Sequence, residues 1–196
     1  MVGAMTEVWK LTGDAALLGS AAAVIDATLR HLTWTDGDAL AAGSTPVAGV
    51  LRESCEQNTL RGQPWPFNYA SPIGSGVAEG CTPDQLQFKG IFVRYLTYYL
   101  QALASNSTAA AAVGGRTLQQ RYAAAVSRQA RSLWETAACL PLVPVAVGAA
   151  VQLPALFGSR WVGPCSGTAG SPSAATQSSA LDAMSGDAIV ACQLGV

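Results

Sequence analysis

The chain has 196 residues, of which 50% are hydrophobic and only 12% are charged. This length is enough for one domain with a substantial core, and the charge content is low for a free-standing soluble domain. The formal net charge is −1, and the 11 basic residues form no run or stripe, which argues against a nucleic-acid surface. The single histidine and the lack of any CxxC pair argue against a zinc site. No metal or cofactor is expected.

The N-terminal third begins with two predicted helices. Apolar spacing predicts a helix over Val2–Leu11, a turn at residues 12–14, and a second helix over Ala15–His31 that is capped by Asp14. Together they form a helical hairpin. Residues 1–11 have no apolar core of the kind a signal peptide needs, so any export signal is expected to lie outside this sequence.

Long polar loops follow the hairpin. Residues 34–46 and 58–80 are predicted loops, and Val47–Glu53 between them is a candidate short strand. Cys55 and Cys81 flank the second loop, and we predict that they form a disulfide, which on the chain-entropy model would stabilise the fold by about 3 kcal/mol. The alternative is two buried free thiols. Five cysteines leave one unpaired within the chain.

The central predicted helix runs from about Pro83 to about Ala104. Thr82 as N-cap, Pro83 at the first position and Gln85 three residues after the cap form a capping box, and Asp84 suits the positive end of the helix dipole. A broad apolar face is predicted at helical spacing and comprises Phe88, Ile91, Phe92, Tyr95, Leu96, Tyr99 and Leu103.

The C-terminal half reads as two further helices with irregular segments between them. A small-residue linker is predicted over Ala104–Gly115, and it contains the glycosylation sequon at Asn106. Helices are predicted over Thr117–Ala138 and Gln177–Cys192. The apolar stretch 137–157 has the length of a membrane span, but its three prolines favour a packed apolar loop. A third possibility is that this stretch lies outside the true coding frame.

The predicted fold class is therefore all-α, with helical hairpins arranged around a toroid axis in one domain, 1–196, that carries an irregular insertion at 137–157.

Candidate catalytic groups are few. Glu53 and Asp84 are the best-placed carboxylates because each is close to a cysteine of the predicted disulfide, whereas Asp36, Asp38 and Glu56 read as solvated loop charges.

Several segments resemble glycoside hydrolase family 76, the endo-α-1,6-mannanases and related fungal cell-wall mannan transglycosidases. The most specific is the helix Phe88-Lys89-Gly90-Ile91-Phe92-Val93-Arg94, which follows Cys81 and the pair Asp84-Gln85. The others are 11–14, 49–55, 132–134, 157–158, 161–164 and 177–181. The resemblance spans nearly the whole chain.

The resemblance implies the C-terminal half of an (α/α)6 barrel that acts on α-mannan, hydrolase or transglycosidase, in an extracellular or cell-wall location. The family's catalytic pair is two adjacent aspartates, and this sequence contains no Asp-Asp. A retaining glycosidase needs two carboxyl groups about 5 Å apart. We therefore assign no catalytic residue and expect this chain to be inactive alone.

What the resemblance leaves is the wall of a sugar cleft near the start of the central helix. Asp84, Gln85 and Lys89 are expected to bond mannose hydroxyls, Trp161 to stack on a pyranose, and Glu53 to orient another donor. The alternative roles are an end cap, a loop salt bridge and core packing. Two other functions stay open: a non-catalytic half-toroid that binds mannan or a partner, and a membrane-associated helical protein. A half-barrel would also expose an apolar surface and self-associate.

Overall fold

The fold is built from helices, and the computed structural model describes residues 1–35, 47–53, 84–139, 155–158, 160–162 and 172–195. The helices are α1 (Val2–Thr12), α2 (Ala15–His31), α3 (Gln85–Ser105), α4 (Ser107–Ala112), α5 (Gly115–Ser132) and α6 (Ala174–Leu194). A π-helical turn, Leu133–Ala137, extends α5. Strands β1 (Ala138–Cys139) and β2 (Leu156–Phe157) pair antiparallel. The all-α class is confirmed for the part of the chain described.

The N-terminal hairpin forms as its sequence predicts. α1 ends at Gly13, which adopts the left-handed conformation with φ 74° and donates its N–H to Trp9 O. Asp14 then caps α2 by accepting a hydrogen bond from the Ala16 N–H at 3.0 Å. Backbone groups at the end of α1 and at the start of α2 therefore find hydrogen-bond partners within a few residues. This is why sequence signals alone placed the two helices correctly.

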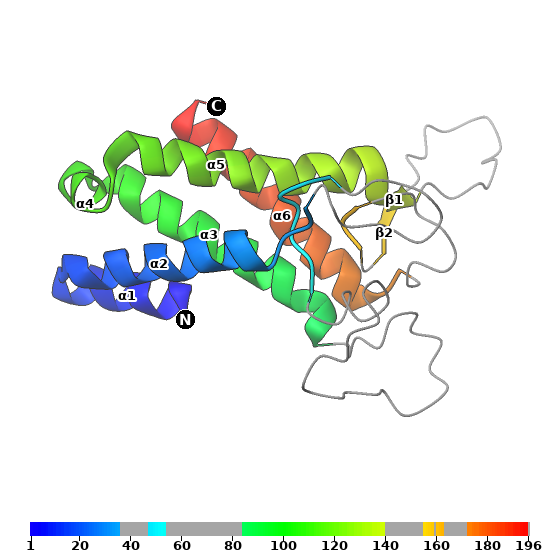
Figure 1. Cartoon of the computed structure of the whole chain (residues 1–196), viewed down its shortest axis with the longest axis horizontal. Helices are drawn as coiled ribbons and strands as arrows, with labels where there is room; N and C mark the ends of the chain where they lie inside the picture. The colour runs from blue at the N-terminus through cyan, green and yellow to red at the C-terminus, as the bar shows by residue number, and fades with distance from the viewer. Residues whose placement is uncertain (36–46, 54–83, 140–154, 159, 163–171, 196) are drawn as a thin grey trace, which may run out of the picture.

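α3 and α6 form the most extensive helix–helix contact, and α5 packs on both of them. Figure 1 shows the α1–α2 hairpin and α5 on opposite sides of α3, with α6 crossing behind it. The core between these helices contains large, fully buried side chains, among them Leu18, Ile25, Tyr99, Tyr122 and Leu133. One hydrophobic cluster connects α1, α2, α3, α5 and α6.

Two predicted details of the central segment differ from the structure. The linker over Ala104–Gly115 contains the short helix α4, whose start is capped by Asn106 accepting from the Ala109 N–H at 2.9 Å. The sequon asparagine is exposed there. The predicted apolar face of α3 is also partly wrong: Phe88 is 53% exposed and Tyr95 37%, whereas Val93, Leu96, Leu100 and Leu103 are buried. The side of α3 that packs on α6 is the side of Gly90, not its most aromatic side.

Other predicted features lie outside the described residues. These are the Cys55–Cys81 disulfide, the Thr82 and Pro83 cap and most of the apolar stretch 137–157. The ends of that stretch lie in β1 and β2. Among the helices that the structure describes, none combines the length and apolar character needed to cross a bilayer.

The closest approach of α3 and α6 depends on Gly90. A Cβ atom at this position would lie 2.5 Å from Ser179 Cα and 2.7 Å from Ser179 O, both backbone atoms. The Gly90 N–H also donates to Ser179 Oγ at 3.0 Å. Only glycine fits here without moving one helix away from the other.

Gly90→Ala is therefore expected to lower the free energy of unfolding by about 1–3 kcal/mol, the usual cost of overpacking. The matched control is Gly19→Ala in α2, where a Cβ would meet nothing within 4 Å. This control should be neutral or stabilise by about 0.5–1 kcal/mol through helix propensity. Urea unfolding measures both changes, and an equal effect of the two substitutions would refute the close packing at Gly90.

Two buried tyrosines make stability depend on alkaline pH. Burial, together with the nearby Asp26 charge, raises the pKa of Tyr99 to about 12 and raises the pKa of Tyr122 as well. A phenol ionises at about pH 10 in the unfolded chain. Between pH 10 and 12 the unfolded state therefore binds fewer protons than the native state, and stability falls as pH rises.

We expect the free energy of unfolding to be constant up to about pH 10 and then to fall by at most about 1.4 kcal/mol per pH unit for each such phenol. Tyr99→Phe removes one of these groups and the hydrogen bond to Leu18 O at 3.1 Å. The variant should be about 1 kcal/mol less stable at neutral pH and show a shallower alkaline decline. Tyr98→Phe, at an exposed position, is the control. An unchanged slope in Tyr99→Phe would contradict the prediction.

Candidate functional site

The segment 47–53 runs beside residues 32–35 and is held there by backbone hydrogen bonds. The Trp34 N–H donates to Val50 O, and the Gly49 N–H donates to Trp34 O, both at 2.8 Å. The Arg52 N–H donates to Leu32 O at 3.0 Å. Thr33 and Leu51 form an isolated antiparallel bridge. The predicted short strand is thus a single bridge, sufficient to fix the direction of the chain toward Glu53.

Gln129 of α5 fastens the same segment from the other side. Its Oε1 accepts from the Leu51 N–H at 2.8 Å, and its Nε2 donates to Gly49 O at 3.1 Å and to Ala125 O at 3.0 Å. The side chain is 1% exposed. A buried amide with its donors and acceptor satisfied gives a specific, costly-to-break attachment. The position of Glu53 is therefore set by α5 as well as by residues 32–35.

Glu53 reaches the second turn of α3. Its Oε1 accepts from the Lys89 backbone N–H at 2.7 Å, and the carboxylate is buried, with 7% of the residue exposed. The first turns of a helix carry a positive potential, so the structure places this negative group where it is favoured. The contact joins two segments that are 36 residues apart in sequence.

The Lys89 side chain continues the cluster toward Trp161. Its Nζ lies 5.2 Å from the centroid of the Trp161 ring, a cation–π distance. Lys89 is 3% exposed and Trp161 is 1% exposed. The Trp161 carbonyl accepts from Ser132 Oγ at 2.6 Å, which ties this tryptophan to the end of α5. Trp161 therefore packs on an ammonium group, and its ring is closed to solvent in this structure.

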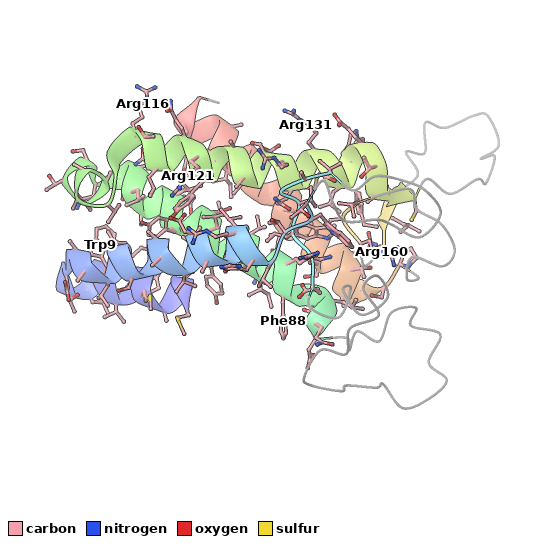
Figure 2. All side chains as sticks on the ribbon, viewed as in Figure 1. Trp9, Phe88, Arg116, Arg121, Arg131 and Arg160 are labelled. Atoms are coloured by element: carbon pink, nitrogen blue, oxygen red, sulfur yellow. The ribbon has the colours of Figure 1, made fainter. Side chains whose placement is uncertain are left out.

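A second cation–π pair lies on the adjoining segment. The Arg52 guanidinium carbon is 5.5 Å from the centroid of the Trp34 ring. Trp34 is 1% exposed, and its indole Nε1–H is buried without a hydrogen-bond acceptor in the part of the chain described. Figure 1 shows segment 47–53, the start of α3, the β1–β2 pair and the start of α6 at the same end of the molecule. Figure 2 places Arg160 at this end as well, beside the strands.

The structure brings together three of the five predicted binding residues: Glu53, Lys89 and Trp161. Asp84 and Gln85 precede Lys89 by about one helical turn on the same helix. Asp84 is exposed at the N-cap position and makes no capping hydrogen bond, and Gln85 is half-buried. They form the solvent-accessible rim of the cluster. We call Glu53, Lys89 and Trp161 with this rim the α3-start cluster.

Sequence reasoning missed two of the residues that position this cluster. Gln129 lies in an ordinary-looking helix, and nothing in its spacing distinguishes it from a surface residue. Trp34 reads as the beginning of a loop. Arg52 belongs to segment 49–55 and Ser132 to segment 132–134, both of which carry the resemblance, so these two residues were within reach of the sequence.

The described residues of the α3-start cluster offer groups that can recognise a ligand. Asp84 and Gln85 present accessible polar groups at the rim, whereas the Lys89 ammonium, the Glu53 carboxylate and the Trp161 ring are buried. The cluster holds one buried carboxylate, whereas glycoside hydrolysis needs a pair. In the described residues no group of three His, Cys, Asp or Glu side chains is placed to hold a metal ion. Elsewhere, Cys139 is disulfide-bonded and Cys192 is a free, exposed thiol.

Comparisons with protein-family models, with curated proteins and with solved structures find no match to this chain. The proposals below therefore depend on the residues and their geometry.

The hydrogen bond between Glu53 and Lys89 yields a direct test of the cluster. Glu53→Ala removes a buried charged acceptor and is expected to destabilise the fold by about 1–3 kcal/mol. Glu53→Gln keeps an acceptor oxygen and should cost less. The control is Glu7→Ala, which breaks only an exposed pair with Lys10 and should change stability by less than about 1 kcal/mol. Equal stability of Glu53→Ala and the native chain in urea unfolding would show that the contact is dispensable.

Proposed function

We propose that this chain is a non-catalytic, mannan-binding half of a glycoside hydrolase-like α/α barrel. Its ligand is α-1,6-mannan or a mannan oligosaccharide, and its site is the α3-start cluster. The resemblance that suggested this function belongs to proteins of the cell surface, so an extracellular or cell-wall location is part of the proposal.

One observation carries the proposal: most of the segments that resemble the family, which are dispersed over the sequence, contact one another at one end of the molecule, whereas segment 11–14 lies at the other end, beside the end of α3. Glu53 of segment 49–55 bonds Lys89 of the central helix, and Lys89 lies over Trp161 of segment 161–164. Ser132 bonds Trp161 O, and Gln177 Nε2 donates to Phe157 O at 2.8 Å. This convergence supports a single site built from those segments.

The rim and the buried residues have different roles in this proposal. Asp84 and Gln85 are accessible and contact the sugar hydroxyls. Glu53, Lys89 and Trp161 are buried and position the start of α3. This division replaces the expected stacking of Trp161 on a pyranose, because that ring is covered in the present structure. Opening of the cluster would be needed for Trp161 to touch a sugar.

The non-catalytic part of the proposal rests on the sequence, which lacks the two adjacent aspartates that the resemblance implies. The exposed face of α3 supports the half-barrel part of the proposal. Phe88, Tyr95 and Tyr98 are 53%, 37% and 40% exposed, and the two tyrosine rings meet edge to face at 5.9 Å. An aromatic face of this kind is suited to packing against further helices.

The test is binding of linear α-1,6-mannan, measured by isothermal titration calorimetry together with an assay for released oligosaccharides. We expect saturable binding and no release. Asp84→Asn should weaken binding about fivefold, the effect of losing one charged hydrogen-bond acceptor. Glu7→Gln, at an exposed site on α1, should bind as the native chain does.

Released oligosaccharides would overturn the non-catalytic assignment. If the chain does not bind mannan, the proposed ligand is wrong. The remaining alternative is an interaction protein, in which the exposed aromatic face of α3 contacts a partner or a second copy of the chain. Concentration-dependent mass in light scattering, abolished by Phe88→Ser, would then favour self-association.

A further inference from the structure

Three arginines from two helices line one groove on the side of the molecule where α2 faces α5. The groove has a volume of about 360 Å³, and its charged lining residues are Asp26 and Arg30 of α2 and Arg121 and Arg128 of α5. Gly49 forms part of its floor. The sequence gives no sign of this grouping, because the first and the last of these arginines, Arg30 and Arg128, are 98 positions apart.

The local charge is strongly positive although the chain carries a net charge of −1. Asp26 is the only acidic residue among the lining residues, and it is already engaged. Arg121 Nη2 lies 2.8 Å from Asp26 Oδ1, and Tyr122 Oη donates to the same oxygen at 2.7 Å. In the described structure neither Arg30 nor Arg128 has a carboxylate within ion-pair distance. Two guanidinium groups therefore remain available at one groove.

Arg121 is fixed rather than freely mobile. Besides its pairing with Asp26, its guanidinium carbon lies 5.0 Å from the centroid of the Tyr122 ring. The Tyr122 side chain is buried, and Ala22 O, 3.1 Å from its hydroxyl oxygen, is an alternative acceptor for its single proton. Arg121 is thus already paired with a carboxylate, and among the described lining residues the uncompensated positive charge comes from Arg30 and Arg128.

Arg128 lies close to Gly49, where a positive φ makes any substitution strained. Gly49 has φ 80°, and a Cβ atom on it would lie 2.3 Å from Arg128 Nη1. The guanidinium therefore lies directly against the Gly49 backbone. Gln129, the next residue on α5, bonds Gly49 O. The same attachment that positions Glu53 thus also holds the floor of this groove against Arg128.

We propose that the groove between α2 and α5 binds a tetrahedral dianion, a phosphate or sulfate group, free or carried by a small molecule. Planar guanidinium groups present paired N–H donors that match phosphate oxygens, and such charge-assisted bonds are strong. The groove falls at the small end of the range for small-molecule sites. This site is separate from the α3-start cluster and does not depend on the proposed mannan binding.

The distribution of the remaining arginines favours a small anion over an extended polyanion. Figure 2 shows Arg116 and Arg131 projecting from α5 on the side away from α2, whereas Arg121 lies on the side toward it. Beyond Arg128 an adjoining groove holds Arg131 together with Glu135, so the positive charge is not continued along α5 as an unbroken basic stripe. A nucleic acid strand would need such a stripe to follow.

The experiment is titration of the whole chain with inorganic phosphate at low ionic strength, followed by calorimetry and by NMR of the arginine side chains, with chloride added to match ionic strength. Saturable binding is expected. Arg30→Gln and Arg128→Gln should each weaken it about tenfold, which is the loss of one charge-assisted interaction. Both residues are exposed, so the variants should fold, and circular dichroism checks this.

Arg116→Gln is the matched control, since Arg116 is an exposed arginine of α5 that lines none of the grooves described. It should bind phosphate as the native chain does. If Arg116→Gln lost as much affinity as Arg128→Gln, the effect would come from net charge alone, and the proposed site would be wrong. No saturable binding by the native chain would overturn it as well.

A second arm distinguishes the source of the dianion. Mannose 6-phosphate and mannose are titrated beside inorganic phosphate. Tighter binding of the sugar phosphate than of phosphate, again lost in Arg128→Gln, assigns the site to phosphorylated small molecules. Equal binding of the two assigns it to the free anion. Saturable binding of mannose with the same dependence on Arg128 would contradict an anion site.

Discussion

The close approach of α3 and α6 is the constraint on which the rest of the structure depends. Small residues make it possible on both helices: Gly90 lies against the Ser179 backbone, and a Cβ on Gly186 would lie 2.7 Å from Thr97 Oγ1. At the exposed edge the Arg94 guanidinium pairs with the Asp182 carboxylate at 2.8 Å. Because the contact extends along both helices, it fixes the rotation of α3, and hence which of its residues are buried and which face solvent.

That rotation buries Lys89, whereas the sequence predicted that its neighbour Phe88 would be buried. With Gly90 toward α6, its neighbour Lys89 is turned inward, and the burial of an ammonium group requires compensating contacts. The Trp161 ring supplies one, and Glu53 binds the backbone of the same residue. Phe88 and Tyr95 are turned outward by the same rotation. The α3-start cluster and the exposed aromatic face thus both result from the way in which α3 packs on α6.

Gln129 connects the two proposed sites. Its amide holds segment 47–53 against α5, and this fixes Glu53 at the start of α3 and Gly49 beneath Arg128. A neutral, buried side chain thereby positions groups of both sites. Replacing such a buried amide is costly because several buried backbone groups would lose their hydrogen-bond partner at once.

The sequence by itself determined what depends on neighbouring residues. Helix periodicity, the Asp14 cap and the glycine turn before it placed α1 and α2 because their hydrogen bonds are made within a few residues. The class of the fold and most helix bounds follow in the same way. Only the tertiary structure decided the pairing of Glu53 with Lys89, because that contact joins residues 36 apart. The grouping of Arg30 with Arg128 likewise depends on the packing of α2 beside α5, which no local pattern encodes. Local interactions fix elements, whereas the rotation and contact of those elements depend on packing over the whole core.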